Sequence, residues 1–283
     1  MLPKDQKRYR HGLLKIRKDG KSEQPKWMAS EKTDVVSVFA RRYSMNIAVI
    51  FAGGIGKRMN NNGIPKQFIK VYNKEILIYT LEHFQKHPQI DEIIIVMLKD
   101  YIERTKELVE LYNISKVNRI VEGGSTGQES IFNGLVAAND ISVSADDIVL
   151  IHDGVRPLIN SQVITDNIES VRANGSAITV ANVVETIVST GSNHTINDVY
   201  ERSVLKIARA PQSFFLADIY PTSRKAIEEK EAFIDSCSLM SHYGYKIYYV
   251  EGPSDNIKIT TVEDYYSFRA IIQAKENIQV YEG

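Results

Sequence analysis

The chain has 283 residues, of which 43% are hydrophobic, and it carries equal numbers of basic and acidic side chains, 35 of each. These values are typical of a globular protein with one large domain or two small ones, and they exclude a strongly basic or acidic protein. No apolar run approaches the roughly 20 residues that span a bilayer, no apolar signal sequence follows the first residues, and the single cysteine, Cys237, excludes an internal disulfide. We therefore expect a cytoplasmic protein without membrane insertion.

The first 44 residues differ from the rest of the chain in charge. They contain 12 Lys or Arg residues and 5 Asp or Glu residues, so this segment carries +7 and the remainder carries −7. It lacks a sustained apolar period, which predicts a basic, largely disordered N-terminal extension at residues 1–44. Its basic residues are interleaved with acids, glycine and proline, which favours a solvated tail over an arm that binds nucleic acid or a membrane surface. The folded domain is predicted to span residues 45–283.

From Met45 onward, short apolar runs alternate with amphipathic stretches. The apolar runs, several of them rich in β-branched residues, predict strands at 47–51, 92–98, 118–122, 148–151 and 246–250. Apolar residues at helical spacing predict helices at 76–85, 101–111, 127–139, 216–229 and 262–275. Strands that alternate with helices predict an α/β fold in which helices cover a mixed, mostly parallel sheet.

The alternation of strands and helices is interrupted after Ser176. Residues 177–188 and 195–200 are rich in β-forming residues and are separated by the turn sequence TGSN at 190–193. This pattern predicts a protruding β-hairpin arm at about 177–202. Near the end of the chain, residues 255–261 alternate like a strand and carry Lys258.

The segment after the first strand has the residues of a polyphosphate site. It reads AGGIGKRM at 52–59 and then PKQF at 65–68. Glycines let backbone N–H groups approach phosphate oxygens closely, and Arg58 and Lys66 add two cations. The loop lacks both the glycine spacing of dinucleotide-binding proteins and the Gly-Lys-Ser/Thr ending of a Walker loop. A turn with only a structural role is the alternative.

Two further motifs follow strands, and ligands of parallel sheets bind at such strand ends. The sequence EGGSTGQES at 122–130 combines two glycines with Ser130 near a helix start, although a plain loop with a helix N-cap has the same residues. The sequence HDGVRP at 152–157 carries Asp153, which could hold Mg²⁺ together with substrate phosphates. Arg156 could bind a phosphate or simply pair with Asp153, and His152 is expected to be a packed histidine without a catalytic role.

In this order, the motifs resemble those of the sugar-alcohol-phosphate cytidylyltransferases. The resemblance covers about residues 45–274 and includes APQ at 210–212 and NIKIT at 256–260. One branch of this family activates ribitol 5-phosphate for cell-wall or capsule polymers, and another activates 2-C-methyl-D-erythritol 4-phosphate for isoprenoid synthesis. The AGG loop, the spacing of Arg58 and Lys66, Val155 and residues 258–262 are more similar to the ribitol branch.

The resemblance implies a Rossmann-like, three-layer nucleotide-binding fold and transfer of CMP from CTP to the acceptor, with Mg²⁺ as cofactor. The residues that match catalytic residues of the family are Arg58, Lys66, Arg202 and Lys258. Contacts to CTP are implied for Ala52, Gly53, Gly54, Gly56, Gly124, Ser125, Ser130 and Gly154. Contacts to the acceptor are implied for Arg156, Thr186 and Arg202, while Asp153 is the expected Mg²⁺ ligand and Asp235 takes part at most indirectly. In relatives the hairpin arm crosses a twofold axis, so a homodimer is expected, with Arg202 serving the neighbouring site.

Two positions depart from the family pattern, and the motifs disfavour other protein classes. Gly127 stands where the family usually has arginine, which weakens the expected contact to CTP, and Ala210 replaces a commoner threonine. A non-catalytic nucleotide-binding protein is disfavoured because Arg58 and Lys66 are both present. A dehydrogenase would need the dinucleotide glycine pattern, and a glycosyltransferase would carry an Asp-x-Asp pair where Asp153 stands alone.

Overall fold

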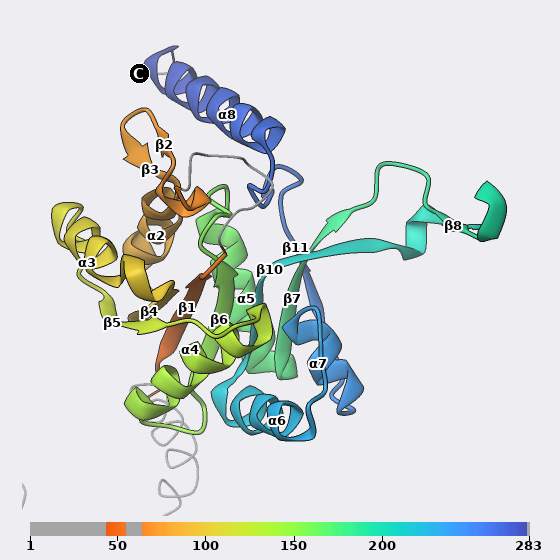
Figure 1. The fold of residues 1–283 in the computed structure, drawn as a ribbon, viewed down its shortest axis with the longest axis horizontal. Coiled ribbons are helices and arrows are strands. Elements are labelled where there is room, and N and C mark those ends of the chain that lie inside the picture. The colour runs from red at the N-terminus through yellow and green to blue at the C-terminus, as the bar shows by residue number, and fades with distance from the viewer. Residues whose placement is uncertain (1–43, 55–63, 282–283) are drawn as a thin grey trace, which may run out of the picture. The chain divides into compact units, whose positions relative to one another are not determined.

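A seven-stranded sheet forms the centre of the domain (Figure 1). The computed structural model describes residues 44–54 and 64–281, so the extension predicted at residues 1–44 lies, apart from Ser44, outside the described residues. The strands of the sheet are β1 (Asn46–Ala52), β4 (Glu92–Met97), β5 (Val117–Glu122), β6 (Ile148–Asp153), β7 (Ser176–Asn182), β10 (Lys206–Phe215) and β11 (Tyr249–Glu251). Their order is β11-β7-β10-β6-β1-β4-β5, and all neighbours run parallel except β10, which is antiparallel to β6 and β7. The predicted mixed, mostly parallel sheet is confirmed.

Helices cover both faces of this sheet (Figure 1). They are α2 (Ile76–Lys86), α3 (Ile102–Leu111), α4 (Gly127–Ile141), α5 (Ser161–Asn174), α6 (Leu216–Glu229) and α7 (Ser236–His242), whereas α8 (Val262–Tyr281) lies away from the sheet. Helices α2, α3 and α5 pack on one face through a buried cluster that includes Leu81 and Ile168. Helices α4, α6 and α7 pack on the other face, where Leu135 and Ile219 are buried. The expected three-layer arrangement is therefore present.

The central strands are buried on both sides because both layers of helices cover them. In β1, Ile47 and Val49 belong to the cluster on one face, whereas Ala48 and Ile50 belong to the cluster on the other. All four side chains are fully buried. Strands of this kind appear in the sequence as continuous apolar runs. The sequence therefore predicts their positions to within a few residues.

Smaller elements complete the domain. They are the hairpin of β2 (Lys70–Val71) and β3 (Lys74–Glu75) and the 3-10 helices η3 (Lys66–Phe68), η4 (Lys99–Tyr101), η5 (Ser192–His194) and η6 (Arg202–Val204). Helix α8 packs Phe268 against Tyr79 of α2, with ring centroids 5.3 Å apart. None of the helices that the structure describes combines the length and the apolar character needed to cross a membrane.

Several segments differ from the sequence prediction. The sequence does not reveal α5, α7 or the long strand β10, and it places β11 a few residues too early. Residues 255–261, which alternate like a strand, form no strand but an irregular connection between β11 and α8. The alternating apolar residues, Ile257 and Ile259, pack in the cluster that includes Phe268 of α8, and the Ile259 N–H donates to the Val155 carbonyl oxygen at 2.8 Å.

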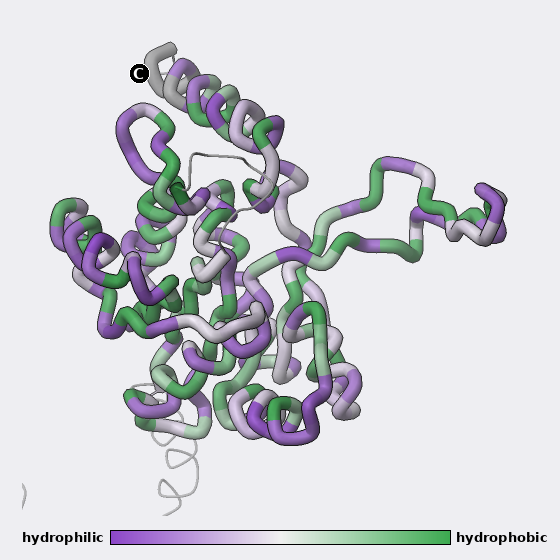
Figure 2. The backbone as a smooth tube through the Cα atoms, viewed as in Figure 1, coloured by the Kyte–Doolittle hydropathy of each residue, from purple (hydrophilic) through white to green (hydrophobic). Residues whose placement is uncertain are grey.

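A hairpin arm is present between β7 and β10, although residues 177–182, which the sequence assigns to it, belong to strand β7 of the central sheet. Strands β8 (Val188–Thr190) and β9 (Ile196–Val199) pair antiparallel within it, and the arm projects away from the sheet (Figure 1). Hydrophobic residues alternate with hydrophilic ones along the arm (Figure 2), and the side chains of Val184 and Val204 are 70% and 75% exposed. A two-stranded hairpin is at best marginally stable alone in water. The stability of the folded arm therefore depends on contacts beyond its own two strands.

Helix α4 approaches the sheet closely at Gly134, and this contact generates a prediction. A Cβ atom there would lie 2.5 Å from Val49 Cγ1 and 2.8 Å from Val96 Cγ2. Gly134→Ala should lower the free energy of unfolding in urea by about 1–3 kcal/mol, because overpacking outweighs the better helix propensity of alanine. Gly127→Ala in the first turn of the same helix is the control, since nothing lies within 4 Å of its Cβ position. Equal stability of the two variants would contradict this packing.

Candidate active site

A cavity of about 380 Å³ opens at the carboxyl ends of β1 and β6, where ligands of parallel sheets bind. Six of the residues expected to contact CTP line it: Ala52, Gly53, Gly54, Gly124, Ser125 and Ser130. Lys66, Lys258 and Asp153 line the same cavity. Arg58 and Gly56 lie outside the described residues. The structure thus brings most of the predicted nucleotide contacts together.

Lys66 is held next to the first glycine turn by its neighbours in the chain. A Cβ atom on Gly54 would lie 3.7 Å from Lys66 Cε, so the lysine side chain passes over the turn. Gln67 is fully buried, and its Nε2 donates to the Ala52 carbonyl oxygen at 2.6 Å. Phe68 stacks on Tyr101 with ring centroids 5.1 Å apart. These two buried side chains fix the backbone that carries Lys66.

The second glycine loop is organised by its own side chains. Ser130 Oγ accepts from the Gly124 N–H at 3.1 Å and donates to the Thr126 carbonyl oxygen at 2.8 Å. The Glu129 carboxylate accepts from the Ser125 hydroxyl and N–H, which lowers the pKa of that carboxyl. Thr126 is the N-cap of α4, accepting from the Glu129 N–H at 3.1 Å. Ser130 therefore shapes the loop, and the helix N-cap is Thr126.

Gly154, another expected CTP contact, is not among the residues that line this cavity. A Cβ atom there would lie 2.8 Å from Ala52 Cβ and 3.1 Å from Leu77 Cδ1. Its N–H donates to the Phe51 carbonyl oxygen at 3.0 Å, and its carbonyl oxygen accepts from Thr80 Oγ1 at 3.1 Å. Gly154 thus lets the ends of β1 and β6 approach α2, a packing role.

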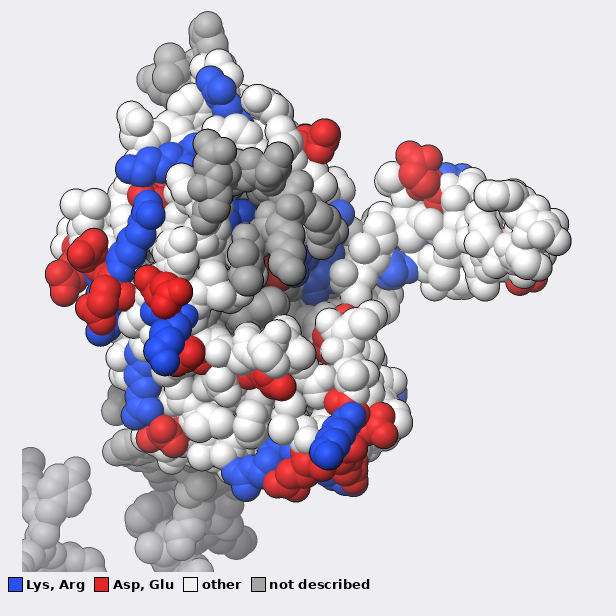
Figure 3. Space-filling model, viewed as in Figure 1, with Lys and Arg blue, Asp and Glu red and all other residues white. Residues whose placement is uncertain are grey.

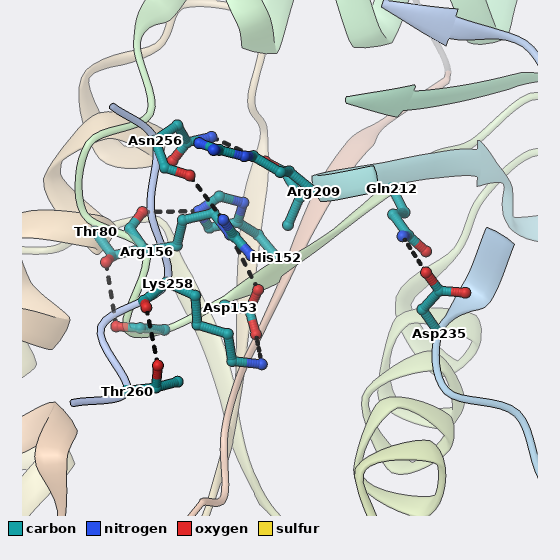
Figure 4. Close-up of polar contacts among 12 residues, drawn as sticks. Thr80, His152, Asp153, Arg156, Arg209, Gln212, Asp235, Asn256, Lys258 and Thr260 are labelled. Atoms are coloured by element: carbon teal, nitrogen blue, oxygen red, sulfur yellow. Dashed lines mark hydrogen bonds and ion pairs between the residues drawn. The ribbon is translucent and has the colours of Figure 1, made fainter. Parts of the chain in front are cut away.

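Asp153 joins the end of β6 to the segment that carries Lys258 (Figure 4). Its Oδ1 lies 2.5 Å from Lys258 Nζ, and its Oδ2 lies 3.2 Å from Arg156 Nε. Burial alone would raise the pKa of Asp153, but the charges of Arg156 and Lys258 outweigh burial and lower it. Arg156 Nη1 also donates to the Asn256 carbonyl oxygen at 2.7 Å. The carboxylate is therefore ionised and bound to two cations.

A second cavity, of about 240 Å³, continues from the first. Both cavities are lined by Phe51, Gly127, Asp153 and Lys258, so they meet at the ion pair of Asp153 and Lys258. Beyond this junction the wall includes Arg156 and the β10 residues 208–210 and 212. Side chains beside the base of the arm are mostly basic, whereas both signs are interspersed over α3 and α6 (Figure 3). Because Gly127 has no side chain, the junction stays open.

The remaining predicted residues have different surroundings. Thr186 and Arg202 lie on the arm, where Arg202 Nη1 donates to the Val184 carbonyl oxygen at 2.9 Å, and neither lines the two cavities. Asp235 caps α7, accepts from Gln212 Nε2 at 3.0 Å and lines the second cavity. Within one chain, the structure separates the arm residues from Lys66 and Lys258.

His152 is a packed histidine, as the sequence predicts. Its ring is fully buried 5.1 Å from the Phe84 ring, and its Nε2 lies 3.1 Å from the Arg156 carbonyl oxygen. Burial lowers the pKa of His152 to about 3, so the ring is neutral near pH 7.

Sequence reasoning assigned no role to Gln67, Asn256 and Arg209. Gln67 lines the first cavity, and Asn256 accepts from Arg156 through its backbone carbonyl oxygen. Each buries a side-chain oxygen without a hydrogen-bond partner among the described residues. Gln67 directly follows Lys66, and Asn256 precedes Lys258 by two residues. In the sequence, Gln67 and Asn256 could have been noticed as polar residues close to a predicted cation. Nothing in the sequence singles out Arg209, because its place at the site depends on the position of β10.

The carboxylates of the site determine how Mg²⁺ could be held. Within residues 44–54 and 64–281, no group of three or more His, Cys, Asp or Glu residues is arranged to hold a metal ion. Mg²⁺ is commonly held by only one or two carboxylates plus substrate phosphates and water. The single carboxylate of Asp153, at the wall of both cavities, fits that pattern.

Known proteins resemble this chain over nearly all of the described domain. The family model for IspD, 2-C-methyl-D-erythritol 4-phosphate cytidylyltransferase, matches residues 46–274. A ribitol-5-phosphate cytidylyltransferase of Vibrio parahaemolyticus is 49% identical over 239 residues, covering 84% of this chain and 100% of that protein. A 2-C-methyl-D-erythritol 4-phosphate cytidylyltransferase of Clostridium botulinum is 39% identical over 222 residues, covering 78% and 94%. The crystal structure of 4-diphosphocytidyl-2C-methyl-D-erythritol synthase from Anaerococcus prevotii superposes with a TM-score of 0.71 at 28% identity, covering 82% and 97%.

Acid should destabilise the fold partly through His152. The unfolded chain protonates this histidine near pH 6.5, whereas the folded chain does so only at about pH 3. The free energy of unfolding should therefore fall as the pH drops through this window, by up to about 1.4 kcal/mol per pH unit from this group. His152→Gln keeps a donor for the Arg156 carbonyl and should flatten the pH profile of urea unfolding between pH 6.5 and 4.

The matched control is His194→Gln, because His194 lies exposed on the arm and loses little hydration on folding. An unchanged slope in His152→Gln would contradict the assignment. Asp153 does not obscure the comparison, since its lowered pKa confines its own contribution to pH values below about its ordinary 3.8.

Proposed function

Because the chain belongs to the IspD family of cytidylyltransferases, we propose that it transfers CMP from CTP to D-ribitol 5-phosphate, forming CDP-ribitol and pyrophosphate. It is a CTP-dependent nucleotidyltransferase, and we place the reaction in the cytoplasm, in keeping with the single cysteine. The observation that carries the proposal is that Lys66 shares the first cavity with Asp153 and Lys258, which also line the second cavity. One cavity can hold the nucleotide while the other holds the acceptor.

In the reaction, a phosphate oxygen of the acceptor attacks the α-phosphorus of CTP. The new P–O bond forms as the bond from that phosphorus to the pyrophosphate oxygen breaks, and negative charge builds on the phosphoryl oxygens. Such a reaction is accelerated by positioning and by preorganised donors. Lys66 beside the Gly53-Gly54 turn supplies these donors, and Arg58, which lies outside the described residues, is proposed to assist it.

The junction residues bring the acceptor to the nucleotide. Lys258 lies at the junction and Arg156 lines the second cavity beside it, and both contact Asp153. We propose that they hold the acceptor phosphate, and that Asp153 holds Mg²⁺ together with phosphate oxygens of CTP. When bound, the ion would neutralise phosphate charge. Without the ion, Asp153 holds Lys258 at the junction through their ion pair.

Ribitol 5-phosphate is preferred as acceptor on the strength of the relatives. The Vibrio ribitol-5-phosphate enzyme shares 49% of its residues with this chain, against 39% for the Clostridium methylerythritol-phosphate enzyme. The product would then serve cell-wall or capsule polymer synthesis. The alternative, 2-C-methyl-D-erythritol 4-phosphate for isoprenoid synthesis, matches the name of the family model.

The arm is proposed to form a homodimer. Its exposed apolar side chains, such as Ile196 and Val199 at 62% and 67% exposure, gain by burial against a second copy. Arg202 and Thr186 lie on this arm and do not line the cavities of their own chain. In a dimer they would serve the neighbouring site.

The proposal is tested by measuring pyrophosphate release from CTP and Mg²⁺ with ribitol 5-phosphate, with 2-C-methyl-D-erythritol 4-phosphate and without acceptor. Ribitol 5-phosphate should give the highest kcat/KM by a wide margin. A dominant signal with methylerythritol phosphate would reverse the choice of acceptor, and no release with either would refute the proposed function. Lys66→Ala is the blank for this assay, since loss of one preorganised donor should lower kcat by roughly 10²–10³ while leaving thermal unfolding unchanged.

Arm exchange can be tested by mixing two inactive variants. If Arg202 serves the neighbouring site, a mixed dimer of Lys66→Ala and Arg202→Ala has one site with both residues intact. Random mixing then restores about a quarter of wild-type turnover, because about half of the dimers are mixed and each has one working site of two. No recovery after refolding the two together, or an active monomer by light scattering, would rule out this arrangement.

A further inference from the structure

Arg209 is a half-buried cation at the wall of the second cavity. Its Nη1 donates to the carbonyl oxygens of Ser254 and Pro253 at 2.9 Å and 3.4 Å. Its Nε–H and the two N–H groups on Nη2 have no acceptor in the described part of the chain, and no carboxylate there lies within ion-pair distance of it. The carbonyl oxygens fix one side of the guanidinium and leave three donors unused.

A second arginine lies close by. Arg156 and Arg209 reach toward the same side of the site, near Asn256 and above Asp153 in the view of Figure 4. Burial lowers the pKa of Arg209, and the neighbouring charge of Arg156 lowers it further, while Asp255 acts in the opposite direction. Like charges held close together in a partly buried place are unfavourable unless an anion joins them.

Cations exceed carboxylates at this end of the second cavity. Arg156, Arg209 and Lys258 line it, and the only carboxylate that the described contacts pair with them is that of Asp153. The other acidic residue of the wall, Asp235, accepts a hydrogen bond from Gln212 and lies apart from these cations, at the right of Figure 4. A phosphate monoester carries a charge of about −1.5 to −2 near pH 7, which would balance this excess.

We propose that Arg209 binds the phosphate of the acceptor together with Arg156 and Lys258 and so orients the attacking oxygen. A guanidinium anchored on one side offers its free N–H groups as a fork, which suits two oxygens of one phosphate. The acceptor chain then extends along the wall formed by Ala208, Ala210 and Gln212. This inference rests on the proposed function, because it assigns the acceptor to the second cavity.

The test compares Arg209→Gln and Arg209→Lys with the wild type in steady-state kinetics, varying CTP and ribitol 5-phosphate separately. Arg209→Gln should raise KM for the acceptor about 10-fold to 100-fold, the usual effect of losing hydrogen bonds to a charged group, and leave KM for CTP unchanged. The Ki of inorganic phosphate as a competitor of the acceptor should rise by a similar factor. Arg209→Lys should recover part of the loss, because it keeps the charge and loses the fork. The control is Arg224→Gln, whose guanidinium lies 4.6 Å from the Tyr220 ring on α6.

A purely structural role would give a different pattern. If Arg209 only tied down Pro253 and Ser254, Arg209→Gln would lower the melting temperature and change both KM values alike, or neither, and either result would overturn the inference. If the wild type formed no product with any acceptor, the proposed function would fail on its own. Calorimetric titration with inorganic phosphate would then decide the inference: weaker binding by Arg209→Gln than by the wild type supports it, and equal binding overturns it.

Discussion

The site depends on one buried carboxylate that remains ionised. Asp153 is 5% exposed, and transfer of a carboxylate from water into a protein costs several kcal/mol unless it is paired and hydrogen-bonded. Lys258 and Arg156 each contact a different oxygen of that carboxylate. Arg156 in turn donates to the carbonyl of Asn256, 100 residues along the chain. The same charges that offset the burial of Asp153 therefore fix the segment that carries Lys258 against the end of β6.

The sheet explains why this carboxylate stands where it does. Strand β6 lies between β1 and β10, and Phe51 near the end of β1 pairs with Asp153 in register. Gly154 follows at once and leaves no room for a side chain, so the two strand ends converge. The first glycine turn and Asp153 are consequently neighbours, although about 100 residues separate them in sequence. The buried strands and Gly154 thus fix the position of Asp153 beside the first glycine turn.

Much of the fold could be read from the sequence because β1, β4 and β6 are buried on both faces and read as continuous apolar runs. Helix α5 was missed although Asn160 caps its start and Gly175, at φ 87°, ends it, since its apolar positions are broken by polar ones. The cations of the site could be predicted where they follow a glycine turn or a known motif. Arg209 could not, because its place follows from the insertion of β10 between β6 and β7, a long-range pairing that local sequence does not encode.

Strand β10 belongs both to the base of the arm and to the wall of the second cavity. Its first residues leave the arm at Lys206, and a few residues later the same strand forms a wall of the second cavity. Strand β7, beside it, supports the other end of the arm. A tilt of the arm therefore shifts the ends of β7 and β10 that carry it, and these ends lie within a few residues of the cavity. The stiffness of the arm's attachment thus limits how far the second cavity can widen or narrow.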